Sequence, residues 1–285
     1  MNGPFGLVCA LNQELACLEK ACSAQPVELR RHPFKTVSLS WQSGEAVVVV
    51  SGMGKVAAAA SAQYLVDVYR PTLLISFGLA GALGGGLKVG DLVLPARVMQ
   101  GDVGTYDATG YRHPYLWDRG ENGLRLSHCC AVHSGLHAAA LSLVGKADRR
   151  VLASPLVTCD QSVFSRSRRR ELRRDLDAEA VDMESAALAR VASLNGLPFL
   201  VLRAISDDSD LEMEDGSFFF SLQSGRKRDR VGGIARCLLS ASARKRLVSL
   251  HEGSARACAV LGEAAWDLLL GLPRVPFGSP SALAP

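Results

Sequence analysis

Short apolar runs that alternate with helix-like segments and glycine-rich turns are the feature that most restricts the fold of this chain. The apolar runs at 46–50 and 73–77 are each followed by a glycine turn, and an alanine-rich segment at 56–69 lies between them. Strands that alternate with helices in this way predict an α/β domain whose sheet is largely parallel or mixed. We therefore expect a single-domain three-layer α/β/α fold with a central mixed twisted sheet.

The composition is that of a globular protein with a substantial core. The 285 residues are 48% hydrophobic and 21% charged. No apolar run reaches the roughly 18 residues of a spanning helix, and the N-terminal residues lack a basic region followed by an apolar signal core. Because the eight cysteines form no C-x-x-C pair, free thiols are favoured over a zinc cage or a disulfide framework. These features predict a cytoplasmic protein.

The character of the sequence changes after Asp210. Residues 211–230 are irregular and contain three successive phenylalanines, whereas 232–272 has the apolar spacing of two or more amphipathic helices. We therefore predict an α/β domain over 1–230 and a C-terminal helical extension over 231–285. The polar segment 101–122 is expected to be a long loop, which in a compact domain is usually functional or part of an interface.

The net charge of +4 is unevenly distributed. Arginines cluster at 166–174, and a second basic group occupies 226–230. The simplest interpretation is a solvated helix face and a loop, and the alternative is an anionic partner or a membrane surface. Neither cluster contains the interleaved aromatic residues of a single-strand nucleic-acid platform, so no nucleic-acid partner is expected.

The apolar run at 200–210 ends abruptly in acidic residues, L-V-L-R-A-I-S-D-D-S-D. Open α/β sheets place their chemistry at the carboxyl ends of parallel strands. Upstream, Asp182 and Glu184 lie on a helix-like segment, where residues two apart face different sides unless a helix terminus intervenes. Two carboxylates on different elements, each beside apolar surface, suit acid/base catalysis on a polar bond.

Two glycine turns carry a weaker signal. The turn S-G-M-G-K at 51–55 lacks the spacing of a P-loop and taken alone predicts a strand-to-helix connection. The turn G-L-A-G at 78–81 allows the backbone to approach either a ligand or a neighbouring helix closely.

In combination, five motifs resemble those of the nucleoside phosphorylase/nucleosidase superfamily, most closely the nucleosidases that cleave methylthioadenosine and S-adenosylhomocysteine. The motifs are G-L-V-C-A-L-N-Q-E-L, S-G-M-G-K-V-A-A-A, F-G-L-A-G-A-L with L-K-V-G-D-L-V-L-P, V-D-M-E-S-A-A-L-A and R-A-I-S-D, and they span roughly 5–210. The resemblance implies an enzyme that hydrolyses the N-glycosidic bond of a 5′-modified adenosine and releases adenine. It implies no metal or organic cofactor, and a homodimer or higher homo-oligomer whose partner loop, here 101–122, closes the 5′ pocket.

The resemblance also implies residue roles. Asp207 would be the general acid at N7 of the leaving purine, Glu14 would activate the attacking water, and Glu184 would bind the sugar hydroxyls. Asp207 would then have to be largely protonated, through burial or through like charge from Asp208 and Asp210. The other substrate-binding positions implied by the motifs are Met183, Ser206, Gly78, Leu79, Ala80, Val163, Met53 and Phe218.

The identity of the nucleophile, water or phosphate, is predicted from the absence of phosphate-binding arginines at the two glycine turns. Phosphorylases of this superfamily hold phosphate with arginines at the first glycine turn and immediately before the second, where this chain has Ser76. A dianion without an arginine partner is a poor ligand, so water is the expected nucleophile.

The chain departs from the methylthioadenosine-type pattern in two places. Ser162 occupies the position of the phenylalanine that stacks on adenine, with Phe164 two residues later, and the tail after Asp210 is long. Both departures resemble the hopanoid-associated branch of the superfamily. One alternative is therefore a phosphorylase that removes adenine from an adenosyl-lipid, with the C-terminal helices contacting the lipid or a bilayer surface. A non-catalytic purine-binding module is the second alternative.

Overall fold

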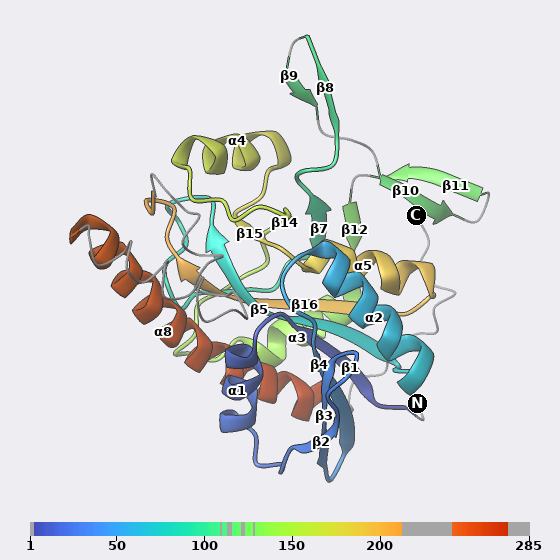
Figure 1. Ribbon diagram of the computed structural model, residues 1–285. Helices are drawn as coiled ribbons and strands as arrows, with labels where there is room; N and C mark the ends of the chain where they lie inside the picture. The colour runs from blue at the N-terminus through green and yellow to red at the C-terminus, as the bar shows by residue number, and fades with distance from the viewer. Residues whose placement is uncertain are drawn as a thin grey trace.

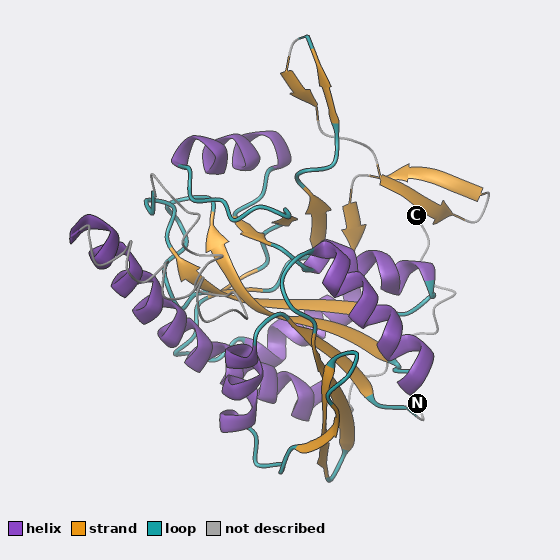
Figure 2. Ribbon diagram, viewed as in Figure 1, coloured by secondary structure: helices purple, strands orange, loops and turns teal. Residues whose placement is uncertain are grey.

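A mixed sheet flanked by helices organises the molecule (Figures 1 and 2). The computed structural model describes residues 3–108, 110–112, 116–120, 123–127, 129–212 and 241–272. Figure 1 shows α2 (Lys55–Tyr69) and α5 (Ser185–Leu194) together on one side of the sheet. On the other side lie α1 (Asn12–Ala21), α3 (Ser134–Val144) and α8 (Ala241–Gly271). The predicted α/β fold with a mixed twisted sheet is confirmed.

The centre of the sheet is parallel. Strand β1 (Phe5–Cys9) lies between β4 (Gly44–Val50) and β5 (Leu73–Ala82), and β16 (Phe199–Asp207) pairs in parallel with β5. These strands are almost continuously apolar because helices cover both of their faces. Their carboxyl ends therefore meet along one edge, where open α/β sheets bind ligands.

Antiparallel strands extend this centre on both sides. Strand β3 runs antiparallel to β4, β15 to β5, and β6 to β16, which makes the sheet mixed. The remaining strands of the sheet are β2 (Val27–Arg30), β3 (Lys35–Trp41), β6 (Leu92–Val93), β7 (Arg97–Gln100), β12 (Cys129–Ala131), β13 (Val151–Leu152), β14 (Leu156–Thr158) and β15 (Ala180–Asp182).

The helices have the local end signals that the sequence suggested. Helix α2 begins after Gly54, which has a φ of 97°, and ends at Arg70 in the left-handed region, directly before a proline. The Ser165 side chain accepts a hydrogen bond at the start of α4. The described helices are α1 (Asn12–Ala21), α2 (Lys55–Tyr69), α3 (Ser134–Val144), α4 (Arg166–Leu176), α5 (Ser185–Leu194) and α8 (Ala241–Gly271).

Two expectations about local structure were wrong. Strand β5 continues through 78–81, where a turn was expected, because β16 pairs with it along this whole stretch. The described part of 101–122 contains strands of two antiparallel hairpins instead of a loop; Figure 1 shows both projecting beyond the sheet. These strands are β8 (Thr105–Asp107), β9 (Gly110–Arg112), β10 (Leu116–Gly120) and β11 (Gly123–Ser127). Residues 241–271 of the predicted helical extension form one 31-residue helix, α8, and residues 232–240 lie outside the described ranges.

Helix α8 packs closely on the α/β core. A Cβ added at Gly253 would lie 2.3 Å from the Ser206 carbonyl oxygen, and one at Gly262 would lie 2.3 Å from that of Cys17. Leu261 and Leu268 of α8 belong to the same apolar cluster as the central strands. Glycine therefore lets α8 touch both β16 and α1. Within the described ranges, no helix has the length and apolar character needed to cross a membrane.

Candidate active site

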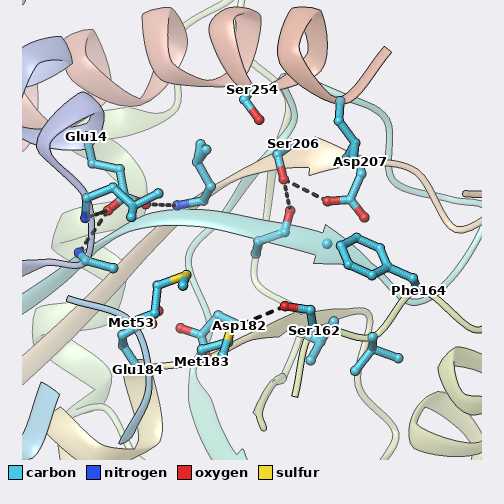
Figure 3. A pocket seen from close by; sticks show the side chains of 18 of the residues that line it. Glu14, Met53, Ser162, Phe164, Asp182, Met183, Glu184, Ser206, Asp207 and Ser254 are labelled. Atoms are coloured by element: carbon cyan, nitrogen blue, oxygen red, sulfur yellow. Dashed lines mark hydrogen bonds between the residues drawn. The ribbon is translucent and has the colours of Figure 1, made fainter. Parts of the chain in front are cut away.

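A cavity of about 280 Å³ lies at the carboxyl ends of β5 and β16, beside α8 (Figure 3). Most of the predicted site residues line it: Glu14, Met53, Leu79, Ala80, Val163, Met183, Glu184, Ser206 and Asp207. Gly78 lies directly behind this lining, next to Glu14. Phe218 lies outside the described residues.

Glu14 lies in the first turn of α1, and its side chain turns back towards the sheet. Its Oε2 accepts hydrogen bonds from the backbone N–H groups of Ala10 and Leu11, each at 2.9 Å, and its Oε1 accepts one from Leu79 at 2.9 Å. Burial raises the pKa of Glu14, and Arg203 and the three N–H groups oppose this rise. The result is a fixed carboxylate whose proton affinity exceeds that of an ordinary glutamate.

Gly78 makes room for this arrangement. A Cβ at this position would lie 2.7 Å from Glu14 Oε1 and 2.6 Å from Arg203 Nη1. A side chain here would displace two charged groups at once, so the first glycine of the G-L-A-G segment has a steric reason in this fold.

Asp182 and Glu184 both reach the cavity because a strand ends and a helix begins between them. Asp182 is the last residue of β15, and Glu184 precedes the first residue of α5. The Gly54 N–H donates to Glu184 Oε1 at 3.0 Å, which ties the first glycine turn to this junction. Burial is the main cause that raises the pKa of Glu184 to about 8, and the Asp182 charge adds to it.

The buried Arg203 of β16 supports these acids from behind. Its Nε donates to Asp182 Oδ2 at 2.8 Å, and its Nη2 lies 3.8 Å from Glu184 Oε2. The same Nη2 donates to Ser76 Oγ at 2.8 Å. Arg203 was not among the predicted site residues, although it is the first letter of the R-A-I-S-D motif.

Asp207 ends β16 at the opposite side of the cavity. Ser206 Oγ donates to Asp207 Oδ1 at 2.7 Å, and the guanidinium of Arg169 forms an ion pair with Asp207 Oδ2. A paired cation favours the ionised carboxylate. That Asp208 and Asp210 hold Asp207 protonated stays a prediction, and the structure places a cation beside this carboxylate.

The interpretation of the 166–174 cluster as a solvated helix face was wrong at one position. Arg169 is only 2% exposed, and its side chain lines the cavity. Arg169 lies three and seven positions before Leu172 and Leu176, the buried leucines of α4, so helical spacing would have placed it on the inward face. Only the tertiary structure shows that this guanidinium reaches Asp207 and the Ala82 carbonyl.

Apolar side chains form the remaining walls. Met53, Leu79 and Met183 lie on the side of the acids, and Phe164 lies beside Asp207 (Figure 3). Phe164 thus supplies an aromatic ring, although Ser162 occupies the position where one was expected. Ser162 instead lies 3.8 Å from the Met183 sulfur.

Helix α8 contributes Leu250, His251 and Ser254 to the cavity lining. Sequence analysis did not include them, because nothing in an amphipathic helix distant in sequence marks it as the cover of a site. Among the described residues, no group of three His, Cys, Asp or Glu side chains is placed to hold a metal ion.

Comparison with known proteins agrees with this geometry. Residues 4–236 match the family model described as the phosphorylase superfamily. The chain belongs to that superfamily. A 5′-methylthioadenosine/S-adenosylhomocysteine nucleosidase of Listeria monocytogenes is 30% identical over 218 residues, covering 73% of this chain and 88% of the relative. One from Actinobacillus succinogenes is 34% identical over 175 residues, covering 60% and 71%. The predicted superfamily and enzyme class, a purine nucleosidase, are confirmed.

Solved structures of the superfamily share the fold. A nucleosidase of the same name from Neisseria meningitidis, in complex with methylthio-immucillin-A, has a TM-score of 0.70 at 23% identity and covers 94% of this chain and 98% of that one. Futalosine hydrolase of Helicobacter pylori has a TM-score of 0.71 at 19% identity, covering 94% and 97%.

Proposed function

We propose that this protein hydrolyses the N-glycosidic bond of a 5′-modified adenosine, such as methylthioadenosine or S-adenosylhomocysteine, and releases adenine. The observation that carries the proposal is the convergence of Glu14, Glu184 and Asp207 from three distant segments on one cavity. A protein that only bound a purine would not need carboxylates at both ends of the scissile bond. The names of the relatives support the same substrate class.

At the sugar end, the acids suit a transition state with positive charge on the ribosyl ring. In this proposal Glu14 takes a proton from water while the water oxygen attacks C1′ and the C1′–N9 bond breaks. Burial has raised the proton affinity of Glu14, which is what a general base near neutral pH requires. Glu184 binds the ribose hydroxyls and fixes the ring over Glu14.

At the base end, the electron pair of the broken bond enters the purine, which must gain a proton. Asp207 takes this proton from solvent and delivers it to N7, so that water and nucleoside become sugar and neutral adenine. Phe164 and Met183 present apolar surface to the base, and Leu79 and Ala80 form the backbone edge between base and sugar.

Water is favoured over phosphate by the charge of the lining. Arg169 is the only arginine among the described lining residues, and its guanidinium is already bound to Asp207 and to backbone carbonyls. A phosphate at C1′ would instead face Glu14 and Glu184. Ser76 cannot substitute for a phosphate-binding arginine, because it is buried in β5 with its hydroxyl bound to Arg203.

A second cavity of about 460 Å³ continues from the first between α1 and α8. The two cavities share Gln13, His251 and Ser254, and small residues, including Ala16 and Ala255, line the second. We assign this groove to the distal part of a 5′ substituent. The substituent would extend from the ribose, pass between Met53 and α8, and enter the groove.

The hopanoid-associated alternative, an adenosyl-lipid as substrate and phosphate as nucleophile, finds no support in these relatives, which are named as nucleosidases. Homo-oligomerisation, closure of the 5′ pocket by a partner's 101–122 segment, a peripheral membrane contact and a cytoplasmic location stay predictions.

One assay tests the proposal. The full chain is incubated with methylthioadenosine, S-adenosylhomocysteine or inosine, with and without inorganic phosphate, and purine release is measured. We expect adenine from the first two substrates at the same rate in either buffer. Strict phosphate dependence would identify a phosphorylase, and absence of release from every adenosine derivative would favour the binding module.

A further inference from the structure

We infer that Arg169 of α4 is a positioning residue that holds Asp207 ionised and aimed at the leaving base. The inference rests on the proposed function, because it concerns how the base end of that site delivers its proton. It goes beyond the predicted roles, in which only burial and the neighbouring acids act on Asp207.

Every nitrogen of the Arg169 guanidinium has a defined partner. Nε donates to the Val163 carbonyl at 2.8 Å, and Nη1 donates to the carbonyls of Ala82 at 2.9 Å and Asp208 at 2.5 Å. Nη2 donates to Asp207 Oδ2. Since a guanidinium fork is planar, these bonds on three sides fix the position of Nη2, and Nη2 fixes the carboxylate.

The Arg169–Asp207 pair lies close against the backbone of Gly81 in β5. A Cβ at Gly81 would lie 3.0 Å from Asp207 Oδ2 and 3.4 Å from Arg169 Nη2. The absence of a side chain at Gly81, the last glycine of the G-L-A-G segment, therefore gives the ion pair room beside β5. The pair joins α4, the Val163 segment and the ends of β5 and β16, the elements that surround the base.

Burial makes the pairing obligatory. The Arg169 side chain is 2% exposed and that of Asp207 is 13% exposed. Among the described residues, Asp207 is the only acid that forms an ion pair with Arg169, so a neutral Asp207 would leave a buried cation without an anion, which is strongly unfavourable. In the free enzyme Asp207 is thus a carboxylate with one oxygen bound to Ser206 and the other to Arg169.

This arrangement has a consequence for recognition. A carboxylate held ionised accepts hydrogen bonds, so it favours a substrate whose base carries a 6-amino donor, and it can accept from N7 only after N7 has been protonated during cleavage. A 6-oxo group would bring a second acceptor against it. Arg169 therefore contributes to the preference for 6-aminopurines without itself taking part in bond cleavage.

The test is a double-mutant cycle with Arg169→Met, Asp207→Asn and the combination, measured as adenine release from methylthioadenosine between pH 5 and 9. We expect Arg169→Met to lower kcat/KM by roughly 10- to 100-fold and to move the acidic limb of its pH profile to higher pH. Because Arg169 acts through Asp207, kcat/KM of the double variant should equal that of Asp207→Asn within about twofold. Arg170→Met, on the exposed side of α4, is the matched control.

A purely structural Arg169 would give different results. The fold losses in kcat/KM of Arg169→Met and Asp207→Asn would then multiply in the double variant. The pH profile of Arg169→Met and its preference for adenosine over inosine derivatives would stay as in the wild type. Full additivity or an unchanged profile and preference overturns the inference. Arg169→Lys, which keeps the charge but loses the fork, should retain the wild-type pH profile at reduced rate. A Lys variant whose pH profile shifts as in the Met variant also overturns it.

An infrared difference spectrum of wild type against Asp207→Asn provides a readout that needs no Arg169 variant. We expect the carboxylate band of Asp207 throughout pH 5.5–8, and a protonated carboxyl band at pH 7 overturns the inference. Failure of the proposed function is distinguishable, because it would appear as a wild-type protein that releases no purine from any substrate.

Discussion

The two ends of the cavity differ in their ratio of carboxylates to arginines. At the sugar end, Glu14, Asp182 and Glu184 surround the single guanidinium of Arg203. At the base end, Asp207 is the one acid of the described residues that pairs with Arg169. One fold thus holds a site of excess negative charge and a balanced ion pair on opposite sides of the same bond.

The acid-rich end also holds two carboxyl groups whose pKa values are raised. Burial is the main cause that raises the pKa of Glu184 to about 8 and the pKa of Glu14 above its ordinary value, and for Glu184 the Asp182 charge adds to it while Arg203 opposes it. The one-to-one pair at the base end has no such excess of acids. The acid-rich end is where the ribosyl ring would gain positive charge, and the balanced end is where the base would need a controlled proton delivery.

The largest effect that would break this comparison is expected at the sugar end. We predict that Glu14→Gln lowers kcat for adenine release about 10³-fold, since general bases contribute roughly 10²–10⁴-fold. The amide also cannot accept from all three N–H groups that hold Glu14. Glu19→Gln on the same helix, outside the cavity lining, is the control. A loss below tenfold would remove Glu14 from the proposed mechanism.

The next largest effect is expected at the base end. Asp207→Asn should lower kcat about 10²-fold, because the amide cannot deliver a proton and leaves Arg169 without its anion. Steady-state rates with methylthioadenosine measure this. Asp210→Asn tests the alternative that like charge governs Asp207, and we expect it to behave as wild type. Wild-type turnover by Asp207→Asn would end the assignment of Asp207 as the acid.

The raised pKa of Glu184 predicts how the stability of the protein depends on pH, which tests the acid-rich end of the cavity. Its pKa in the folded state, about 8, lies above the ordinary glutamate value of 4.5. The folded state therefore binds its proton more tightly, and the associated stability is present below about pH 4.5 and is lost as the pH rises through 8. The thermal midpoint of the wild type should fall more between pH 5 and 8.5 than that of Glu184→Gln. Equal slopes would show that Glu184 is ionised throughout. We also expect this variant to lose about tenfold in kcat/KM through weaker ribose binding.

The smallest effect is expected in the second cavity, the groove between α1 and α8, where the shape of the lining is tested and not its charge. Ala255→Phe should leave cleavage of methylthioadenosine within about twofold of wild type but raise KM for S-adenosylhomocysteine several-fold, because the ring fills space assigned to the longer substituent. Arg256→Phe, which does not line the groove, is the matched control. Equal effects on both substrates would place the 5′ substituent elsewhere.

Local sequence predicted most of what is local in the structure. The parallel strands and the helices α2 to α5 follow from apolar runs, turn residues and caps, and the motif residues reach the cavity because each stands at the end of a strand or the start of a helix. The extension of β5 through 78–81 and the hairpins after 101 escaped prediction, since strand pairing depends on a partner segment that a local pattern does not contain.

Sequence by itself determined the superfamily, the fold and the set of acids, because these depend on short motifs whose geometry is set by neighbouring residues. Only the tertiary structure decided which arginine meets which acid. Arg169 and Asp207 are 38 positions apart, and Arg203 and Ser76 are 127 apart. The same holds for α8, whose part in the cavity depends on Gly253 fitting against Ser206. Charge balance in a buried site is a property of such contacts, so it becomes visible only when the chain has folded.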